Sequence, residues 1–221
     1  MIVAIDGPAA SGKSTAAKKI AQELNMLYID TGAMYRAVAL YAFEQNVALD
    51  NLLAMNILLD NIKLDYKTVE GAEQIYLNGK NVTSKIRTQE ITKLSSEIAT
   101  IKIVRTKMVE LQRLLSKNHH DVILDGRDIG TVVFPNADVK LFLVASIDVR
   151  AKRRLAELEK KGVKTDFESV RIDLEWRDKN DSKRAESPLV KAEDAIEIDT
   201  SNLTLEAQVK KMLKIIEKNS R

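Results

Sequence analysis

The sequence predicts an α/β fold in which a central parallel sheet is flanked by helices. Short apolar runs that look like buried strands, such as residues 2–5 and 122–124, alternate with stretches that have helical apolar spacing. Strands that alternate with helices form parallel sheets, because each helix carries the chain back to the start of the next strand. Such folds bind ligands outside the carboxyl ends of their strands, so we expect the binding residues to follow the strands directly.

The individual elements follow from hydrophobic spacing and turn residues. We expect strands at residues 2–5, 27–29, 122–124, 139–144 and 195–198. We expect helices at residues 13–23, 34–45, 89–100, 102–117, 147–160 and 166–180. Asp30-Thr31-Gly32 is predicted as a turn. An amphipathic helix closes the chain and carries Leu205, Val209, Met212 and Ile216.

A segment of different character interrupts this alternation at approximately residues 62–83. Residues 62–66 alternate in the manner of a strand, a polar turn with Gly71 follows, and residues 74–77 form a second strand. Asn78-Gly79 comes next, which is the strongest two-residue hairpin signal. The sequence therefore predicts a small antiparallel insert within the strand–helix chain.

Composition narrows the possible partners and environment. The 221 residues include 45% apolar and 30% charged residues, and 35 Lys+Arg against 32 Asp+Glu give a net charge of +3. That balance gives no support for a nucleic-acid or membrane partner, so we expect neither. The chain has no cysteine, which excludes disulfides and thiolate sites and suits the reducing cytosol. We find no long apolar run or export signal, and we expect a cytoplasmic monomer.

A phosphate-binding motif follows the first predicted strand and opens the first predicted helix. It fits G-x-x-x-x-G-K-[ST] and reads Gly7-Pro8-Ala9-Ala10-Ser11-Gly12-Lys13-Ser14, followed by Thr15. Its glycines let the backbone curl so that N–H groups point at phosphate oxygens, and the helix N-terminus adds partial positive charge. Lys13 would reach the β- and γ-phosphates, and the Ser14 hydroxyl would bind Mg²⁺. This P-loop predicts a nucleoside triphosphate site.

Arginines near the strand ends indicate what happens to that phosphate. A kinase for small molecules needs a second anion site, and forked guanidinium groups suit phosphate oxygens. Arg36 lies just past the second predicted strand and Arg127 just past residues 122–124. Spacing puts two further sets on helical faces, namely Arg150 with Arg154, and Arg177 with Asp181 and Arg184 if that helix continues so far. No guanine-reading N-K-x-D segment is present, so a switch GTPase is not indicated.

Four separated segments together resemble one family. Residues 7–15, 30–36, 125–131 and 177–188 are similar to the bacterial cytidylate kinases, the CMP/dCMP kinases among the nucleoside monophosphate kinases. The likeness covers essentially residues 1–221 as a single domain. It implies a P-loop kinase fold, in which the insert enlarges the acceptor-nucleotide region and a mobile lid spans approximately residues 155–170. It also implies transfer of the ATP γ-phosphoryl group to CMP or dCMP, with Mg²⁺ as cofactor.

The resemblance also implies roles for individual residues. Residues 7–15 with Arg150 and Arg154 would bind ATP, and the catalytic residues would be Lys13, Arg127 and Arg177. Contacts to the acceptor nucleotide would come from Thr31, Arg36, Ser96, Arg105, Arg127, Asp128, Arg177, Asp181 and Arg184. Among these, Ser96, Arg105 and Asp128 resemble cytosine readers, although the adjacent Ser95 is an alternative to Ser96.

Two questions stay open at this stage. Asp125 ends an apolar strand as a Walker-B-like carboxylate would, so it could orient a Mg²⁺-bound water or instead bind the loop backbone. The P-loop itself would also suit another small-metabolite kinase, or a nucleotide-gated binding module that hydrolyses ATP slowly. Acceptor-dependent turnover separates a kinase from such a module.

Overall fold

The computed structural model describes residues 1–69, 72–117 and 119–219. The chain divides into two compact units. The first unit comprises Met1–Tyr28 and His119–Arg221, and the second comprises Ile29–Asn118. Within the described residues, no helix has the length and apolar character needed to cross a membrane.

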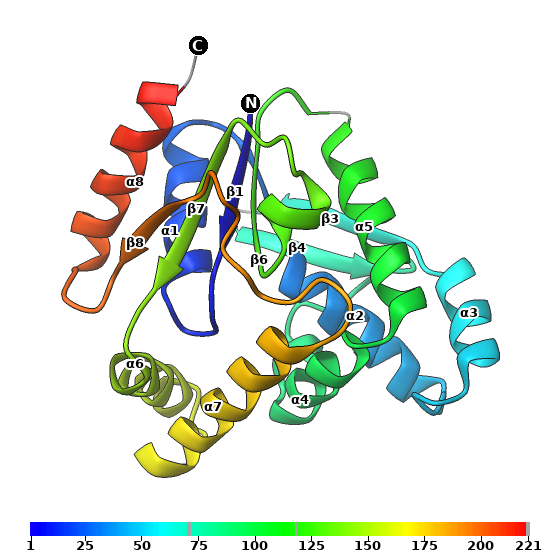
Figure 1. Cartoon of the computed structure of the whole chain (residues 1–221). Coiled ribbons are helices and arrows are strands. Elements are labelled where there is room, and N and C mark those ends of the chain that lie inside the picture. The colour runs from blue at the N-terminus through cyan, green and yellow to red at the C-terminus, as the bar shows by residue number, and fades with distance from the viewer. Residues whose placement is uncertain (70–71, 118, 220–221) are drawn as a thin grey trace. The chain divides into compact units, whose positions relative to one another are not determined.

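A five-stranded sheet organises the first unit (Figure 1). Its order is β2 (Leu27–Asp30), β6 (Val122–Gly126), β1 (Ile2–Asp6), β7 (Val139–Val144) and β8 (Ile196–Asp199). The central β1 pairs in parallel with both β6 and β7, and β7 pairs in parallel with β8. Asp6 is in register with Gly126. The loops that follow β1 and β6 therefore leave the sheet at the same edge.

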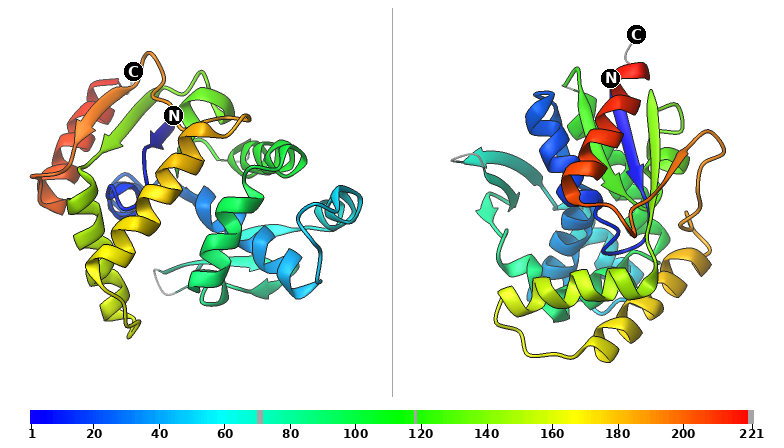
Figure 2. Two further views of the ribbon diagram at one scale, coloured as in Figure 1. Left: turned by 60° about the horizontal axis from the view of Figure 1, so that its bottom comes forward. Right: turned by 90° about the vertical axis from the view of Figure 1, so that its left-hand side faces the viewer.

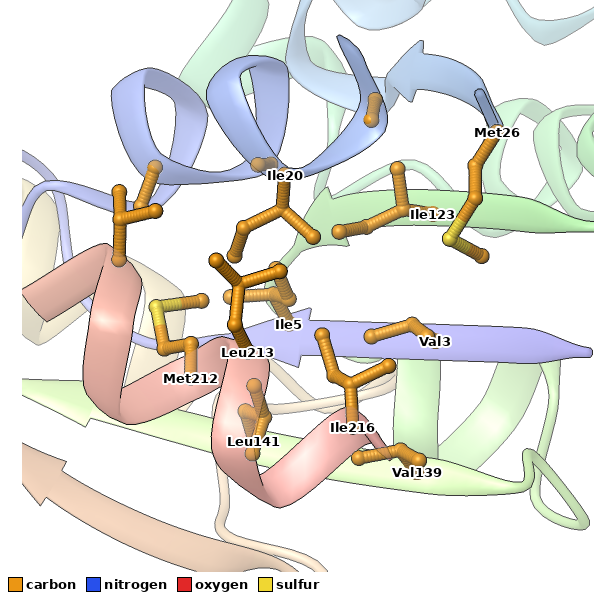
Figure 3. Packing of buried hydrophobic residues seen from close by; sticks show 14 of the residues in the cluster. Val3, Ile5, Ile20, Met26, Ile123, Val139, Leu141, Met212, Leu213 and Ile216 are labelled. Atoms are coloured by element: carbon orange, nitrogen blue, oxygen red, sulfur yellow. The ribbon is translucent and has the colours of Figure 1, made fainter. Parts of the chain in front are cut away.

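Two helices cover one face of this sheet. Apolar side chains of α1 (Lys13–Glu23) and α8 (Leu205–Asn219) interdigitate with those of β1, β6 and β7 (Figure 3). Ile20 and Ile216 are completely buried there beside Ile5. Full burial of one such side chain contributes about 1.5–3 kcal/mol. This packing fixes the strand that leads into the P-loop and the helix that leaves it.

A helical pair extends the first unit. Helices α6 (Ile147–Lys160) and α7 (Phe167–Lys183) lie side by side and are joined by residues 161–166 (Figure 2). Each begins at a side-chain cap, which is Ser146 for α6 and Asp166 for α7. Their apolar residues form a second small cluster that includes Ala9 of the P-loop. A five-residue π-helical turn, η2 (Ile129–Val133), follows β6.

The second unit combines helices with the predicted antiparallel insert. Its helices are α2 (Thr31–Glu44), α3 (Leu52–Asp60), the 3₁₀ turn η1 (Lys85–Arg87), α4 (Gln89–Ile98) and α5 (Lys102–Lys117). Its sheet has the order β3 (Leu64–Val69), β4 (Ala72–Leu77) and β5 (Lys80–Asn81), and both pairings are antiparallel. Asn78 and Gly79 have φ values of 48° and 80°, as the predicted two-residue hairpin requires. The expected turn at Gly71 lies outside the described residues.

Several predicted boundaries were wrong. The segment Asp30-Thr31-Gly32 is not a separate turn, because Asp30 caps α2 by accepting the Ala33 N–H and the helix begins at Thr31. Helix α3 was not predicted. The helix expected at 166–180 continues to Lys183, yet Arg184 lies one residue beyond its end with extended backbone. The three-residue set of Arg177, Asp181 and Arg184 is therefore not wholly helical.

Candidate active site

The P-loop connects β1 to α1 and has the backbone geometry that its glycines predict. Gly7 has φ of 145°, and a Cβ there would lie only 2.1 Å from the Leu143 carbonyl oxygen, so no other residue fits. Gly12 has φ of 91° and is the N-cap of α1. It has no side chain that could occupy the first N–H groups of the helix, which suits an anion there.

Four carbonyl oxygens of the P-loop accept hydrogen bonds from side chains of the first unit. Lys13 Nζ donates to the Pro8 oxygen at 2.6 Å, and Arg150 Nη1 donates to the Ala9 oxygen at 3.3 Å. Thr200 Oγ1 donates to the Ser11 oxygen at 3.0 Å, and Gln208 Nε2 donates to the Gly12 oxygen at 3.3 Å. Peptide N–H and C=O groups point in opposite directions, so bonding the carbonyls outward turns the N–H groups toward a phosphate. Sequence reasoning missed Thr200 and Gln208, which lie about 190 residues from the loop in sequence.

Lys13 is the most strongly perturbed cation of the loop. Its side chain is buried, and desolvation together with the nearby Arg127 guanidinium lowers its pKa to about 7. Asp125, Asp6 and Asp181 oppose that shift through their negative charge. A buried ammonium gains much from a bound triphosphate, because the negative charge of the ligand offsets the cost of desolvation.

Ser14 and Asp125 form an oxygen pair beside Lys13. The Ser14 hydroxyl donates to Asp125 Oδ2 at 2.7 Å, and the Tyr28 hydroxyl donates to Asp125 Oδ1 at 2.6 Å. Asp125 thus accepts hydrogen bonds from two side-chain hydroxyls. A hydroxyl and a carboxylate are hard oxygen ligands, and Mg²⁺ at kinase sites uses one or two such groups plus phosphates and waters. The donor set therefore fits Mg²⁺.

Asp6 is a second carboxylate at this edge, and sequence reasoning missed it. It ends β1 directly before the P-loop, and its two oxygens accept the N–H groups of Ile129 and Gly130 at 2.9 and 2.8 Å. Burial raises its pKa to about 6, although these N–H groups oppose the shift. A carboxylate at the end of an otherwise apolar strand was the available signal. Asp6 binds the loop backbone, the role that had been considered for Asp125.

An alternating chain of charges follows β6. Arg127 Nε donates to Asp181 Oδ2 at 2.6 Å. Arg184 lies between two carboxylates, at 3.8 Å from both Asp181 Oδ1 and Asp128 Oδ1. Burial alone would raise the pKa of Asp181, but the guanidinium groups of Arg127, Arg184 and Arg177 lower it below its ordinary value. The structure thus brings these five predicted site residues together.

Arg150 and Arg154 have different surroundings. The Arg150 guanidinium is buried and makes two hydrogen bonds to the Asp178 carboxylate, at 3.1 and 2.6 Å. It also reaches the Ala9 carbonyl and therefore joins α6, α7 and the P-loop. Arg154 is partly exposed and pairs with Glu157 at 2.8 Å. Of these two arginines, only Arg150 touches the P-loop among the contacts in the described residues.

In the second unit, Arg36 and Thr31 lie on the first turns of α2. Asp30 caps this helix with Oδ1 and pairs with Arg36 Nη2 through Oδ2 at 3.1 Å. The side chain of Arg36 is one-fifth exposed, while its buried Nε has no hydrogen-bond partner among the described residues. Thr31 is buried. An orphaned guanidinium donor of this kind suits an anionic ligand.

The predicted base-reading residues of the second unit lie on α4 and α5. Ser95 and Ser96 are both buried, and each hydroxyl donates to the Thr92 carbonyl, at 2.7 and 3.4 Å respectively. The longer bond of Ser96 is the weaker one. Arg105 Nη1 donates to the Ala99 carbonyl at 3.1 Å, and its guanidinium carbon lies 5.6 Å from the centre of the Tyr35 ring.

The sequence was compared with known protein families and proteins. A family model described as cytidylate kinase matches residues 3–218. The chain belongs to the cytidylate kinase family. A cytidylate kinase of Lactobacillus johnsonii is 50% identical over 221 residues, which cover 100% of this chain and 96% of the relative. A cytidylate kinase of Fusobacterium nucleatum is 52% identical and covers 99% and 98% of the two chains.

Solved structures with much lower identity share the fold of this cytidylate kinase family member. The protein TT1252 from Thermus thermophilus has a TM-score of 0.53 at 16% identity, with 100% of this chain and 98% of that chain covered. A shikimate kinase from Acinetobacter baumannii has a TM-score of 0.50 at 14% identity, with 99% and 94% covered. These similarities support the P-loop kinase fold that the sequence predicts.

Proposed function

We propose that this protein transfers the γ-phosphoryl group of ATP to CMP or dCMP, giving ADP and CDP or dCDP. The observation that carries the proposal is the family match over almost the whole chain, joined to a formed P-loop with a buried Lys13. The protein is accordingly a nucleoside monophosphate kinase that acts on small-molecule nucleotides.

The ATP site is proposed at residues 7–15. The N–H groups of the loop and of the first turn of α1 would bind phosphate oxygens, and Lys13 would stabilise the charge on the transferred group. The perturbed pKa of Lys13 supports this role, because a buried cation near an arginine is typical of a site built for phosphate. Arg150 would hold the loop through Ala9, and Arg154 would lie near the bound ATP.

The acceptor site is proposed from two sets of residues. Arg127 and Arg177 would act as catalytic residues at the transferred phosphoryl group, and Asp181 and Arg184 would contact the acceptor's phosphate and sugar. Thr31 and Arg36 would bind the acceptor, with Arg36 on its phosphate. The cytosine edge would be read by Asp128, Arg105 and Ser96, and the longer helix bond of Ser96 favours it over Ser95 for this role.

The proposed reaction depends on the positioning of the two nucleotides more than on proton transfer. Phosphoryl transfer has a loose transition state with charge on the equatorial oxygens, so arginine and lysine side chains supply most of the catalysis. The acceptor is already a phosphate monoester oxyanion, and no general base is required. Ser14 and Asp125 would hold Mg²⁺, which neutralises charge on the phosphate oxygens when bound.

A lid is proposed at approximately residues 155–170, which comprise the end of α6, the connecting loop and the start of α7. Its closure would exclude water and so suppress wasteful hydrolysis of ATP. We propose a monomeric, cytoplasmic enzyme.

Release of ADP across a panel of acceptors tests the proposal. The panel comprises CMP, dCMP, UMP, AMP and shikimate, each supplied with MgATP in a coupled assay. We expect turnover that depends on CMP or dCMP. Turnover only with AMP or shikimate would assign a different kinase, and slow ADP release without any acceptor dependence would assign a binding module.

A further inference from the structure

The Asp6 carboxylate accepts hydrogen bonds from two backbone N–H groups of a turn that is distant in the sequence. Its Oδ1 accepts the N–H of Ile129 at 2.9 Å and its Oδ2 accepts the N–H of Gly130 at 2.8 Å. These are the first two residues of the π-helical turn η2. N–H groups at the start of a helical turn lack partners within the turn, and the side chain of the N-cap residue ordinarily supplies one. Here a carboxylate from β1 supplies both acceptors.

The N-cap residue of η2 is Asp128, a residue type that usually caps with its own side chain. Within this described segment, Asp128 makes no such cap. Its Oδ1 instead lies 3.8 Å from Arg184 Nη2, and both side chains are almost inaccessible. The hydrogen bonds that Asp6 accepts therefore take the place of the side-chain cap that Asp128 would ordinarily make to the backbone of its own turn.

The turn itself is an unusual element. The Val133 N–H reaches the Asp128 carbonyl at 3.1 Å and the Phe134 N–H reaches the Ile129 carbonyl at 2.7 Å, both across five residues. Such π-type turns are rare and occur often at functional sites. Asp6 ties the start of this turn to the strand that carries the P-loop, so the position of Asp128 depends on the same strand.

We propose that Asp6 is a positioning residue for the choice of acceptor. By capping η2 in place of Asp128, it keeps the Asp128 carboxylate in the orientation in which it would read the acceptor base. This inference rests on the proposed function, in which Asp128 reads cytosine. Asp6 itself does not contact the nucleotide in this account, and its effect passes through Asp128.

Replacement of Asp6 by asparagine tests the inference. An amide has one acceptor oxygen, so one of the two N–H groups would face an NH₂ donor and the turn would shift. Displacements of about 1 Å at such sites can cost up to about 100-fold in rate. In Asp6→Asn we expect kcat/KM for CMP to fall about 10-fold more than kcat/KM for UMP. The loss of the negative charge near Lys13 should affect both acceptors alike, so it should leave their ratio unchanged.

A matched control separates positioning from loss of stability. Ile216→Val removes one buried methylene from the core of the same unit and lies on α8, away from η2. We expect the CMP/UMP ratio of this control to equal that of the wild type. An Asp6→Asn variant that lowers kcat/KM for both acceptors by the same factor would overturn the inference, because Asp6 would then be merely structural.

Two further measurements test the inference, and the first of them does not require Asp6→Asn to fold. In wild type and Asp128→Ala, amide hydrogen exchange of Ile129 and Gly130 should be equally slow, because Asp6 supplies their acceptors. Faster exchange of these two amides in Asp128→Ala would show that Asp128 holds the turn and would overturn the inference. In the double variant Asp6→Asn/Asp128→Ala, the CMP/UMP ratio should be no lower than in Asp128→Ala alone.

The outcomes also distinguish this inference from the function on which it rests. A wild-type enzyme without CMP-dependent turnover would overturn the proposed function. A wild-type enzyme that phosphorylates CMP, combined with an unchanged CMP/UMP ratio in Asp6→Asn, would overturn the positioning role alone.

Discussion

Ser14 and Asp125 are 111 residues apart in sequence, and the Ser14 hydroxyl donates a 2.7 Å hydrogen bond to Asp125 Oδ2. The Tyr28 hydroxyl occupies the other carboxylate oxygen at 2.6 Å. This three-residue arrangement presents a hydroxyl and a carboxylate next to the P-loop lysine, and it is the structural basis of the Mg²⁺ site that we propose.

Activity should require Mg²⁺ and disappear in EDTA. Ser14→Ala and Asp125→Asn each remove a proposed ligand, so both should raise the Mg²⁺ concentration needed for half-maximal rate. Tyr28→Phe is the matched variant, because it removes one hydrogen bond to Asp125 and keeps both proposed ligands. Its effect should be the smallest of the three. Metal-independent phosphorylation, or an equal effect of all three variants, would be inconsistent with a metal site at this pair.

Lys13→Ala should lower turnover by about 10²–10³ or more, as the loss of a preorganised charge stabiliser does. The physical reason is that the buried ammonium of Lys13 lies in the P-loop, where it would stabilise the negative charge of the transferred phosphoryl group. Steady-state kinetics with CMP and circular dichroism on the same sample provide the measurement and the folding control. A folded variant with near-normal turnover would remove Lys13 from the phosphate site.

Asp128→Ala should lose transition-state binding for CMP by about 2–4 kcal/mol, because it removes the buried charge-assisted hydrogen bond that we propose between Asp128 and the cytosine amino group. Uracil presents a carbonyl there, so UMP should be affected much less and the CMP/UMP ratio of kcat/KM should collapse. Arg36→Ala is the control, since loss of a phosphate contact should weaken both acceptors alike. Equal losses for the two acceptors in Asp128→Ala would make Asp128 a structural or phosphate-side residue.

The titration of Asp6 should change how the free energy of unfolding depends on pH. Its pKa is about 6 in the folded protein against an ordinary value of 3.8, so the folded state binds more protons between these values. The contribution of Asp6 to the free energy of unfolding is therefore full below about pH 4 and falls as the pH rises through 6. As the pH rises from about 4.5 to 7.5, the free energy of unfolding of the wild type should therefore fall by about 2 kcal/mol relative to that of Asp6→Asn.

Urea denaturation of both proteins at several pH values measures this difference, because the other titrating groups are common to the two. A difference that does not change over this range would mean that burial leaves the Asp6 carboxyl at its ordinary pKa.

Much of the fold could be predicted because local patterns determine it. Strand β7 and helices α1 and α6 have the predicted bounds, and the hairpin follows from two residues that tolerate positive φ. Helix α3 was missed: its apolar residues include Leu52, Leu53 and Ile57, which are exposed, so they give no clear one-sided spacing. The start of α2 was missed because Asp30 was assigned to a turn when it acts as a helix cap.

In the candidate site, too, residues of a local motif could be predicted and contacts between distant segments could not. Lys13 and Ser14 could be predicted because consecutive residues of one motif carry them. The contacts of Asp6, Thr200 and Gln208 could not, because each side chain binds a backbone group that is far away in the sequence. A single sequence without structure contains no pattern for such contacts. Asp125 shows the intermediate case, in which the residue was identified but its partners, Ser14 and Tyr28, were not.

The most direct test of the central claim follows the transferred group itself. ATP labelled at the γ-phosphate is mixed with excess enzyme, Mg²⁺ and CMP, and the labelled products of a single turnover are separated. We expect the label to appear in the β-phosphate of CDP, with little inorganic phosphate. Label released mainly as inorganic phosphate, at a rate that does not depend on CMP, would contradict this claim.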